Sequence, residues 1–265
     1  MMTKHKSIDG GLPEDNSGLR SPINHDPDYR GKSSSSATID LWMLNLDQPQ
    51  GRLDCLEASL TAEEISRASK FVLNLHKRRF IAAHGLLREI LALYLAVSPA
   101  EPVFACGPHG KPALAPSWSG KRVHFNLSHS NELGLCAISW NLEVGVDIEQ
   151  VRPLEDMYAI AGAVFSSKET AYLKSLAPSA RTTPFFRIWV EKEAYLKAVG
   201  RGMSFPPHLV EVPHQPQEGR SEVVVPEGSS ELSGFHVMEL TPARGYVAAV
   251  AAKDGDWKIQ FRHLP

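Results

Sequence analysis

The chain has 265 residues and a formal net charge of −2, from 28 basic and 30 acidic side chains. This length can form one large domain or two small ones, and the even charge balance argues against bulk attraction to nucleic acid or to an anionic membrane. The sequence has three widely spaced cysteines, no uninterrupted apolar run long enough to cross a bilayer and no signal-peptide core, so we expect a cytoplasmic protein.

Residues 1–38 are rich in Gly, Pro, Asp, Asn and Ser and contain almost no apolar side chains. Because such a segment buries too little surface to offset the entropy lost on ordering, we expect a disordered tail over 1–38. Ordered structure is expected to begin with a strand near residues 39–44. Thr61, with acidic residues in the next turn, predicts a helix N-terminus, and apolar spacing predicts a second helix over 78–96.

Beyond a turn-rich loop at 107–112, the pattern changes repeatedly between strand and helix. The predicted strands are at 123–127, 134–140, 143–149, 235–240, 246–251 and 257–261, the last reached through an Asp254-Gly255 hairpin turn, and the predicted helices are at 154–163, 167–176 and 183–199. Interspersed helices and strands with antiparallel final strands predict an α+β fold. Two halves of similar pattern also permit two α/β lobes, over 39–140 and 141–265.

Residues 144–149 read Val-Gly-Val-Asp-Ile-Glu, and strand alternation places Gly145, Asp147 and Glu149 on one face. Two carboxylates two positions apart lie about 6–7 Å from each other along a strand, close enough to share one cation. A simply solvated outer face of an edge strand is the alternative interpretation.

Trp189, Glu193 and Lys197 are spaced by four and therefore form one row of the helix predicted over 183–199. A Trp in this row indicates that the row faces protein, which would bring Glu193 and Lys197 toward a partly buried cleft where charges need partners. The alternative is an exposed i,i+4 pair that stabilises the helix by about 0.2–0.5 kcal/mol.

Polar and basic side chains that could bind phosphate occur in two further segments. Residues 125–130, Phe-Asn-Leu-Ser-His-Ser, take a predicted strand into a polar turn that presents several donors, although those side chains could equally satisfy one another. Basic residues cluster around the start of the helix predicted over 78–96, where they could bind a phosphate group. The alternative is that each of them is simply a solvated surface side chain. These basic residues are Arg67, Lys70, His76, Lys77, Arg78 and Arg79, with Lys111 as an ambiguous addition in the loop at 107–112.

The order and spacing of these segments resemble the 4′-phosphopantetheinyl transferases of the larger, Sfp-like class, over roughly residues 55–205. The matching segments are Gly110-Lys111-Pro112, Phe125-Asn126-Leu127-Ser128-His129-Ser130, Gly145-Val146-Asp147-Ile148-Glu149, Phe165-Ser166-Ser167-Lys168-Glu169 and Trp189-Val190-Glu191-Lys192-Glu193-Ala194-Tyr195-Leu196-Lys197. The resemblance implies two similar α/β lobes related by a pseudo-twofold axis. It also implies an enzyme that transfers the phosphopantetheine arm of coenzyme A to a serine of an apo acyl or peptidyl carrier protein, releasing adenosine 3′,5′-bisphosphate.

The resemblance also implies roles for individual residues. Asp147, Glu149 and Glu193 would hold Mg²⁺, Glu193 would also be the base for the carrier serine, and Lys197 would neutralise the pyrophosphate and assist the leaving group. The implied coenzyme A contacts are Ser128 and His129 for phosphate, Lys111 and Pro112 for the nucleotide, and, for the 3′-phosphate, a choice among Arg67, Lys70, Arg78 and Arg79 in which Arg79 is favoured. A monomer would suffice to form this site.

Two rival hypotheses follow from the same residues. A metal-dependent phosphoesterase acting on coenzyme A-like nucleotides would use similar acids, a histidine and basic residues, and it would cleave coenzyme A without an acceptor protein. A non-catalytic module that recruits carrier proteins would bind coenzyme A without transfer.

Overall fold

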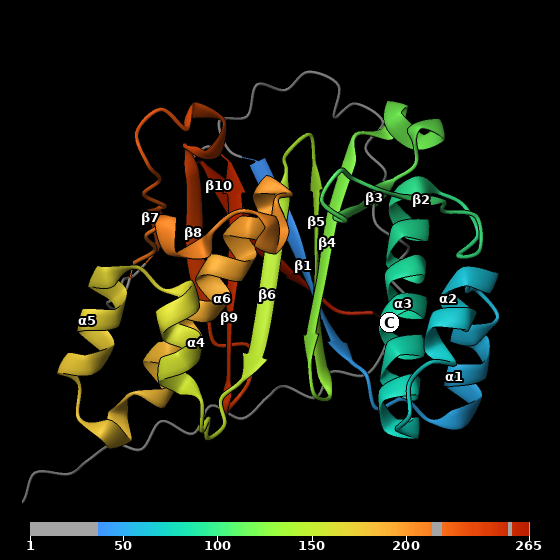
Figure 1. The fold of residues 1–265 in the computed structure, drawn as a ribbon. Helices are drawn as coiled ribbons and strands as arrows, with labels where there is room; N and C mark the ends of the chain where they lie inside the picture. Colours follow the sequence, from blue (N-terminus) through green and yellow to red (C-terminus); the bar gives the residue numbers. More distant parts are fainter. Residues whose placement is uncertain (1–36, 214–218, 254–255, 265) are drawn as a thin grey trace, which may run out of the picture. The chain divides into compact units, whose positions relative to one another are not determined.

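The computed structural model describes residues 37–213, 219–253 and 256–264, in which two four-stranded sheets are flanked by helices (Figure 1). The tail predicted over 1–38 lies outside the described residues, apart from its last two positions, which begin strand β1. The combination of helices with largely antiparallel strand pairs confirms the predicted α+β class. None of the described helices combines the length and apolarity that crossing a membrane requires.

The first sheet brings together segments that are distant in the sequence. Its strand order is β10-β1-β5-β4, and the strands in that order are Trp257–Arg262, Ala37–Asn45, Leu133–Trp140 and Val123–Ser130. β5 pairs antiparallel with both β1 and β4, whereas β10 pairs parallel with β1. A parallel neighbour requires a connection that crosses over rather than a tight turn.

The second sheet has the strand order β6-β9-β8-β7, with antiparallel pairing throughout. Its strands in that order are Val144–Gln150, Tyr246–Lys253, Phe235–Leu240 and Arg220–Glu222. The predicted hairpin turn at Asp254-Gly255 lies outside the described residues, but the prediction of a hairpin is wrong. β9 belongs to this sheet, whereas β10 pairs with β1 in the first sheet, and a turn pattern alone cannot identify the partner of the strand that follows.

The helices flank the two sheets, and the two longest helices, α3 and α6, pack against different sheets. In Figure 1, α3 lies beside β4 with α1 and α2 on its outer side, and α6 lies in front of β6, β9 and β8. The helices are α1 (Gln50–Glu57), α2 (Ala62–Ala68), α3 (Asn74–Leu95), α4 (Met157–Val164), α5 (Ser167–Ser175) and α6 (Thr182–Val199). Shorter elements are the hairpin of β2 (Phe104–Cys106) and β3 (Pro112–Leu114) and the 3-10 turns Pro116–Lys121, Pro178–Ala180, Gly202–Ser204, Pro207–Leu209 and Ser230–Leu232.

Two apolar cores lie on opposite faces of the second sheet. Val144, Val146 and Ile148 belong to the core that β6 and β9 share with β1 and β5, and all three are fully buried. The second core packs α4 and α6 against the opposite face of β8 and β9. The alternation predicted for residues 144–149 is therefore confirmed, and the solvated alternative is wrong, because Asp147 on the other face is only 5% exposed.

Gly145 allows α6 to lie directly on β6. A Cβ atom placed on Gly145 would be 2.0 Å from the carbonyl oxygen of Ala194 and 2.4 Å from the backbone nitrogen of Ala198. No side chain fits at such distances, so only glycine permits this approach. The close contact brings the helix residues near Ala194 and Ala198 over the acidic face of the strand.

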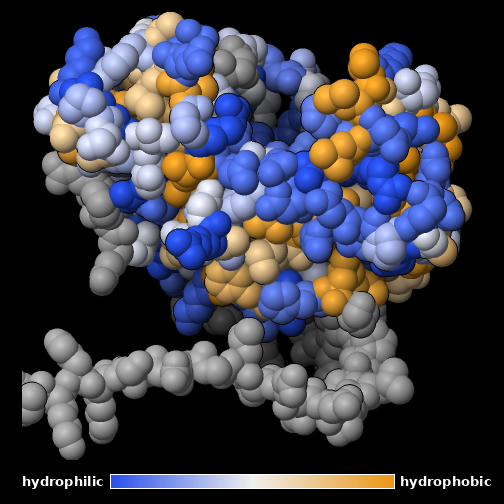
Figure 2. Space-filling view, turned by 90° about the horizontal axis from the view of Figure 1, so that it is seen from below, coloured by the Kyte–Doolittle hydropathy of each residue, from blue (hydrophilic) through white to orange (hydrophobic). Residues whose placement is uncertain are grey.

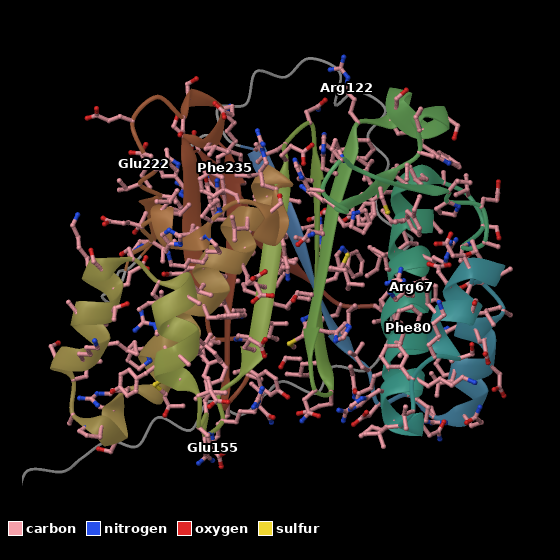
Figure 3. The ribbon with its side chains drawn as sticks, in the orientation of Figure 1. Arg67, Phe80, Arg122, Glu155, Glu222 and Phe235 are labelled. Atoms are coloured by element: carbon pink, nitrogen blue, oxygen red, sulfur yellow. The ribbon has the colours of Figure 1, made fainter. Side chains whose placement is uncertain are left out.

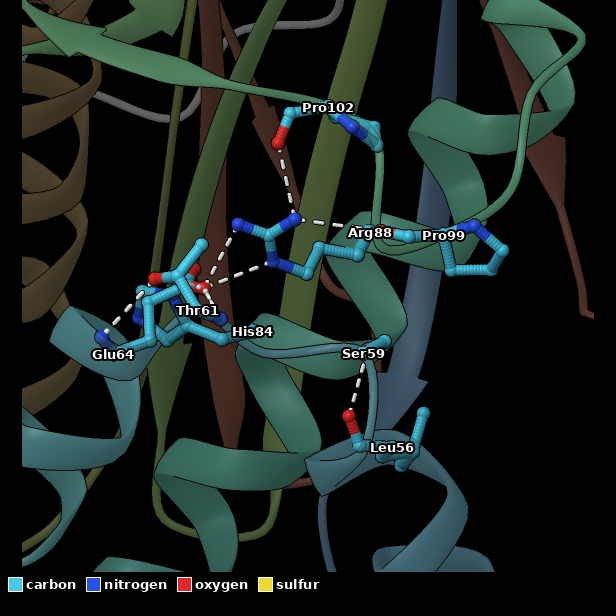
Figure 4. Close-up of polar contacts among 8 residues, drawn as sticks. All are labelled: Leu56, Ser59, Thr61, Glu64, His84, Arg88, Pro99 and Pro102. Atoms are coloured by element: carbon cyan, nitrogen blue, oxygen red, sulfur yellow. Dashed lines mark hydrogen bonds and ion pairs between the residues drawn. The ribbon is translucent and has the colours of Figure 1, made fainter.

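A buried ion pair holds α2 against α3 (Figure 4). Glu64 accepts hydrogen bonds from the Thr61 backbone at 2.9 Å and from Arg88 Nε at 2.9 Å, and Arg88 also donates to the Pro102 carbonyl at 3.0 Å. Thr61 caps α2 as predicted. Burial alone would raise the pKa of Glu64, but hydrogen bonds from His84, the Thr61 backbone and Arg88 lower it to about 2.

Candidate active site

Three elements, β4, β6 and α6, bring Ser128, Asp147 and Lys197 into direct contact. Asp147 Oδ1 accepts hydrogen bonds from Ser128 Oγ at 2.6 Å and from Lys197 Nζ at 2.6 Å, and Lys197 Nζ lies 3.1 Å from Ser128 Oγ. Lys197 also donates to the Val146 carbonyl at 3.3 Å. In the described part of the chain Lys197 pairs with this acid on β6, and no ion pair joins it to Glu193 on its own helix.

Asp147 presents one oxygen that nothing in the described protein satisfies. Its Oδ2 atom is buried and has no hydrogen-bond partner, although Oδ1 has two. A buried carboxylate oxygen without a partner costs free energy, so groups of this kind in native proteins call for an explanation such as an absent ion or ligand.

Glu149 and Glu193 stand close enough to Asp147 to feel its charge. Burial raises the pKa of Glu149, the charge of Asp147 raises it further, and the Ser130 hydroxyl opposes the change. Burial also raises the pKa of Glu193, with the charges of Asp147 and Glu149 acting in the same direction and Lys197 opposing them. The three acids of the sequence prediction therefore share one electrostatic environment that disfavours three negative charges.

The structure does not arrange these acids as a ready coordination shell. Within residues 37–213, 219–253 and 256–264, no group of three or more His, Cys, Asp or Glu side chains is placed to hold a metal ion. The structure places the three carboxylates near one another, two on β6 and one on the facing helix α6.

His129 follows Ser128 on β4 and is exposed. Partial burial of its ring lowers the pKa of His129, and the positive charges of His84, Lys197 and Arg79 lower it further. A histidine among cations is mainly neutral at neutral pH and gains a proton when an anion arrives.

Lys111 lies at the end of α6 and has three acceptors. Its Nζ donates to Glu143 Oε2 at 2.7 Å, to the Ala198 carbonyl at 3.1 Å and to the Val144 carbonyl at 3.2 Å. A hydrogen bond from His124, followed by that from Lys111, lowers the pKa of Glu143 to about 2 against the effect of burial. Lys111 thus ties the β2–β3 loop to β6 and α6, while Pro112 begins β3 and is exposed.

The candidate arginines are held in different ways. Arg79 bonds Asp47 through Nε at 2.7 Å, and it also donates to the Asn131 side chain at the turn after β4. Arg67 is exposed, with its guanidinium 5.4 Å from the centre of the Phe80 ring (Figure 3). The positive charge of Arg79 is among those that lower the pKa of His129.

Asn126 and Ser130 contact the acidic strand but were missed as individual site residues. Both lie on β4 at two positions from Ser128, so strand alternation puts all three side chains on one face. This i, i+2, i+4 spacing was the signal available in the sequence. Asn126 accepts a hydrogen bond from the Val146 backbone at 2.8 Å, and Ser130 Oγ donates to Glu149 Oε2 at 2.7 Å.

Comparisons with known proteins identify the family of the chain. The family model described as the 4′-phosphopantetheinyl transferase superfamily matches residues 143–251, which contain the acidic strand and α6. The chain is 37% identical over 228 residues to the 4′-phosphopantetheinyl transferase HetI of Nostoc sp., covering 86% of this chain and 93% of the relative. It is 29% identical over 192 residues to a 4′-phosphopantetheinyl transferase of Bacillus subtilis, covering 72% and 83%. A putative 4′-phosphopantetheinyl transferase of Synechocystis sp., slr0495, is 34% identical over 164 residues, covering 62% and 65%. The chain therefore belongs to the 4′-phosphopantetheinyl transferase superfamily.

Proposed function

We propose that this protein transfers the 4′-phosphopantetheine group of coenzyme A to a serine hydroxyl of an apo acyl or peptidyl carrier protein, releasing adenosine 3′,5′-bisphosphate. The observation that carries the proposal is the convergence of Asp147, Glu149, Glu193 and Lys197 where β6 meets α6. Family membership gives this cluster its chemical meaning, because the related proteins are named for the same transfer.

The reaction breaks the bond between the pyrophosphate bridge and the phosphopantetheine phosphorus and forms a bond from that phosphorus to the serine oxygen. Phosphoryl transfer of this kind needs an aligned nucleophile, positive charge on the phosphate oxygens and a neutralised leaving group, with little covalent work by the protein. Lys197 is suited to the leaving group, since its ammonium is partly exposed and already directed at the acidic strand. Glu193 is suited to take the serine proton, since its raised pKa makes it a stronger base than an ordinary glutamate.

Mg²⁺ is the metal that we propose for this site, held by Asp147, Glu149 and Glu193. The residues fit such an ion: Asp147 Oδ2 is buried without a partner, and the pKa values of Glu149 and Glu193 are raised by burial and by neighbouring negative charge. Carboxylate oxygens are the ligands that Mg²⁺ prefers, usually together with water and substrate phosphate. When bound, the ion supplies the positive charge that draws the pyrophosphate toward these acids.

The remaining site residues would bind coenzyme A. Ser128 fixes Asp147 and can turn toward phosphate, and His129 would become a cation beside an arriving phosphate. We place the 3′-phosphate near Arg79, with exposed Arg67 as the second candidate. Lys111 and Pro112 would line the nucleotide site, although Lys111 would first have to share or release its present acceptors.

We infer two lobes, over 39–140 and 141–265, related by a pseudo-twofold axis, with coenzyme A bound between them. Two four-stranded sheets, each accompanied by one long helix, support this inference, and β10 would be a strand that the second lobe lends to the first. A single chain would complete the site, so we expect a monomer that acts in the cytoplasm.

The phosphoesterase alternative has no support from the comparisons, since the related proteins described above are transferases. The decisive experiment incubates the protein with coenzyme A, Mg²⁺ and a panel of apo carrier proteins, followed by intact-mass analysis. We expect a mass gain of one phosphopantetheine on at least one carrier and the loss of that gain in EDTA. Cleavage of coenzyme A without any carrier would contradict the proposal and favour the phosphoesterase, and binding without either reaction would favour the recruiting module.

A further inference from the structure

The two sheets meet at their edge strands, β4 and β6. An edge strand presents backbone N–H and C=O groups that no neighbouring strand pairs. No backbone ladder joins β4 to β6 among the described strands, since β4 pairs with β5 and β6 pairs with β9. Something else must therefore set the register between the two edges.

Side chains of β4 occupy the place of the missing ladder. Asn126 Oδ1 accepts from the Val146 backbone N–H at 2.8 Å, and Ser130 Oγ accepts from the Gln150 backbone N–H at 3.1 Å. Both bonds join residues 20 positions apart. A constant offset means that the two strands run in the same direction at one fixed register, as they do in Figure 1.

Ser130 connects this register to the orientation of an acid. Its hydroxyl accepts from the Gln150 N–H and donates to Glu149 Oε2 at 2.7 Å, so the direction of its single proton is determined by its neighbours. Ser128 is placed in the same way, with Lys197 as its donor and Asp147 Oδ1 as its acceptor. Each serine thus occupies one oxygen of one carboxylate, and Asp147 Oδ2 stays without a protein partner.

We propose that Asn126 and Ser130 are positioning residues that set β6 against β4, and that Ser130 also fixes Glu149 so that its second oxygen is available to the cation. The inference rests on the proposed function, because it concerns the acids proposed to bind that cation. Neither residue needs to touch coenzyme A or the reacting phosphorus. Their effect reaches the site through the backbone of β6 and through one carboxylate.

The test is a titration of the full chain with Mn²⁺ at saturating coenzyme A. The electron paramagnetic resonance signal of free Mn²⁺ measures binding, and a titration of coenzyme A alone corrects for the Mn²⁺ that coenzyme A binds. Loss of a hydrogen bond that orients a metal ligand weakens metal affinity by about 10–100-fold, and we expect Ser130→Ala to fall in this range. Ser130→Thr keeps the hydroxyl and should stay within about threefold of wild type, by the same reasoning. Ser139→Ala is the matched control, because Ser139 lies on the neighbouring strand β5 and donates to the Leu142 carbonyl instead.

Amide hydrogen exchange, read by NMR, provides a local measurement that general destabilisation would not reproduce. Asn126→Ala should speed exchange mainly at Val146, and Ser130→Ala mainly at Gln150. If Ser130→Ala does not fold, the comparison is made between Ser130→Thr and Ser130→Val, which have nearly the same volume and differ in the hydroxyl.

Unchanged Mn²⁺ affinity in Ser130→Ala, or in Ser130→Val when that comparison is used, overturns the inference. So does equal weakening in Ser139→Ala, and so does a wild-type protein that binds no Mn²⁺. Transfer to carrier proteins is measured on the same wild-type sample. Transfer by a wild type whose Ser130 variants bind Mn²⁺ normally would leave the proposed function standing and remove only the positioning role.

Discussion

Helix α6 carries two lysine–carboxylate pairs, five residues apart, that differ in how completely they are satisfied. Lys192 pairs with Glu169 at 2.9 Å, where both side chains are at most 1% exposed. Lys197 pairs with Asp147 at 2.6 Å, where the lysine side chain is 27% exposed. Both lysines belong to the same short sequence segment, so their types and spacing do not distinguish them.

In the first pair every polar atom has a partner. Lys192 also donates to the carbonyls of Pro207 and Val210, and Glu169 accepts from the Val212 backbone at 2.9 Å and from the Ser166 backbone at 2.7 Å. Those bonds join α5 and α6 to the segment that follows Pro207. A buried ion pair whose polar atoms are all hydrogen-bonded fixes the packing of the elements around it and has no free donor or acceptor for a ligand.

The second pair is incomplete. Asp147 keeps one buried oxygen without a partner, and two further acids nearby have raised pKa values. The comparison teaches that unmet bonding capacity, more than the presence of charge, separates a site prepared for ligands from a structural ion pair.

The largest expected effect is on the rate of transfer, when Glu193 beside the Lys197–Asp147 pair is substituted. We expect Glu193→Gln to lower the rate of carrier modification by about 10²–10⁴-fold, the range for losing a general base, while the Kd for coenzyme A changes far less. Rates come from intact-mass time courses and affinities from calorimetric titration. Parallel losses of rate and affinity would reduce Glu193 to a binding residue.

The two lysines should respond oppositely to substitution by Met. Lys192→Met leaves Glu169 buried without its cation and is expected to lower the free energy of unfolding by about 3–5 kcal/mol. Lys197→Met should lower that free energy by less than Lys192→Met does, since the Lys197 side chain is 27% exposed, but it should slow transfer strongly. Urea denaturation and the transfer assay on both variants decide this, and similar unfolding energies for the two would break the comparison.

Gly145→Ala should disturb the support beneath the site. The added methyl group would overlap backbone atoms of Ala194 and Ala198, and such overpacking costs about 1–3 kcal/mol or more. Gly162→Ala in α4 is the matched control, because its added Cβ meets no atom within 4 Å and should be neutral or slightly stabilising. Thermal unfolding of both variants provides the measurement, and equal melting temperatures would show that α6 can move away from β6 without loss.

The smallest expected effect is on how the free energy of unfolding depends on pH. Glu193 and Glu64 should contribute to this dependence with opposite signs. The pKa of Glu193 is raised above 4.5 in the folded protein, so the free energy of unfolding decreases as pH rises above about 4.5 and Glu193 loses its proton. The free energy of unfolding of Glu193→Gln should therefore increase relative to that of the wild type as pH rises. The pKa of Glu64 is lowered to about 2, so its contribution is present above about 4.5 and is lost as pH falls toward 2. Glu64→Gln should therefore be most destabilising above pH 4.5. Urea denaturation from pH 3 to 7 tests both, and parallel curves for the two variants would contradict the assignment.

Much of the fold was readable from local patterns. Alternation in residues 144–149 correctly separated Val144, Val146 and Ile148 from Asp147, because a strand with a core on one face must alternate. The Thr61 cap was also correct, since capping chemistry is local. Helix α3 begins at Asn74, four residues before the predicted start, because neither a side-chain cap nor an acidic first turn marks its N-terminus.

The remaining features depend on contacts between distant segments. Nothing near Lys111 in the sequence predicts that Glu143 and the carbonyl of Ala198 will hold it, because those partners are 32 and 87 positions away. The same holds for Ser130, whose strand position was visible but whose partner strand was not. Local patterns identify which side chains share a face, and only the fold decides what that face meets.

The parallel pairing of β10 with β1 has a consequence for synthesis of the chain. The hydrogen bond from Arg262 to Asp40, at 2.8 Å, joins residues 222 positions apart. At a ribosomal rate of about 5–20 residues per second, β1 waits roughly 10–45 seconds for its neighbour. During this time its open edge can accept a strand from another chain. The first sheet to be started is therefore among the last parts to be completed, and a nascent chain would benefit from a chaperone that shields β1 until residues 257–262 have left the ribosome.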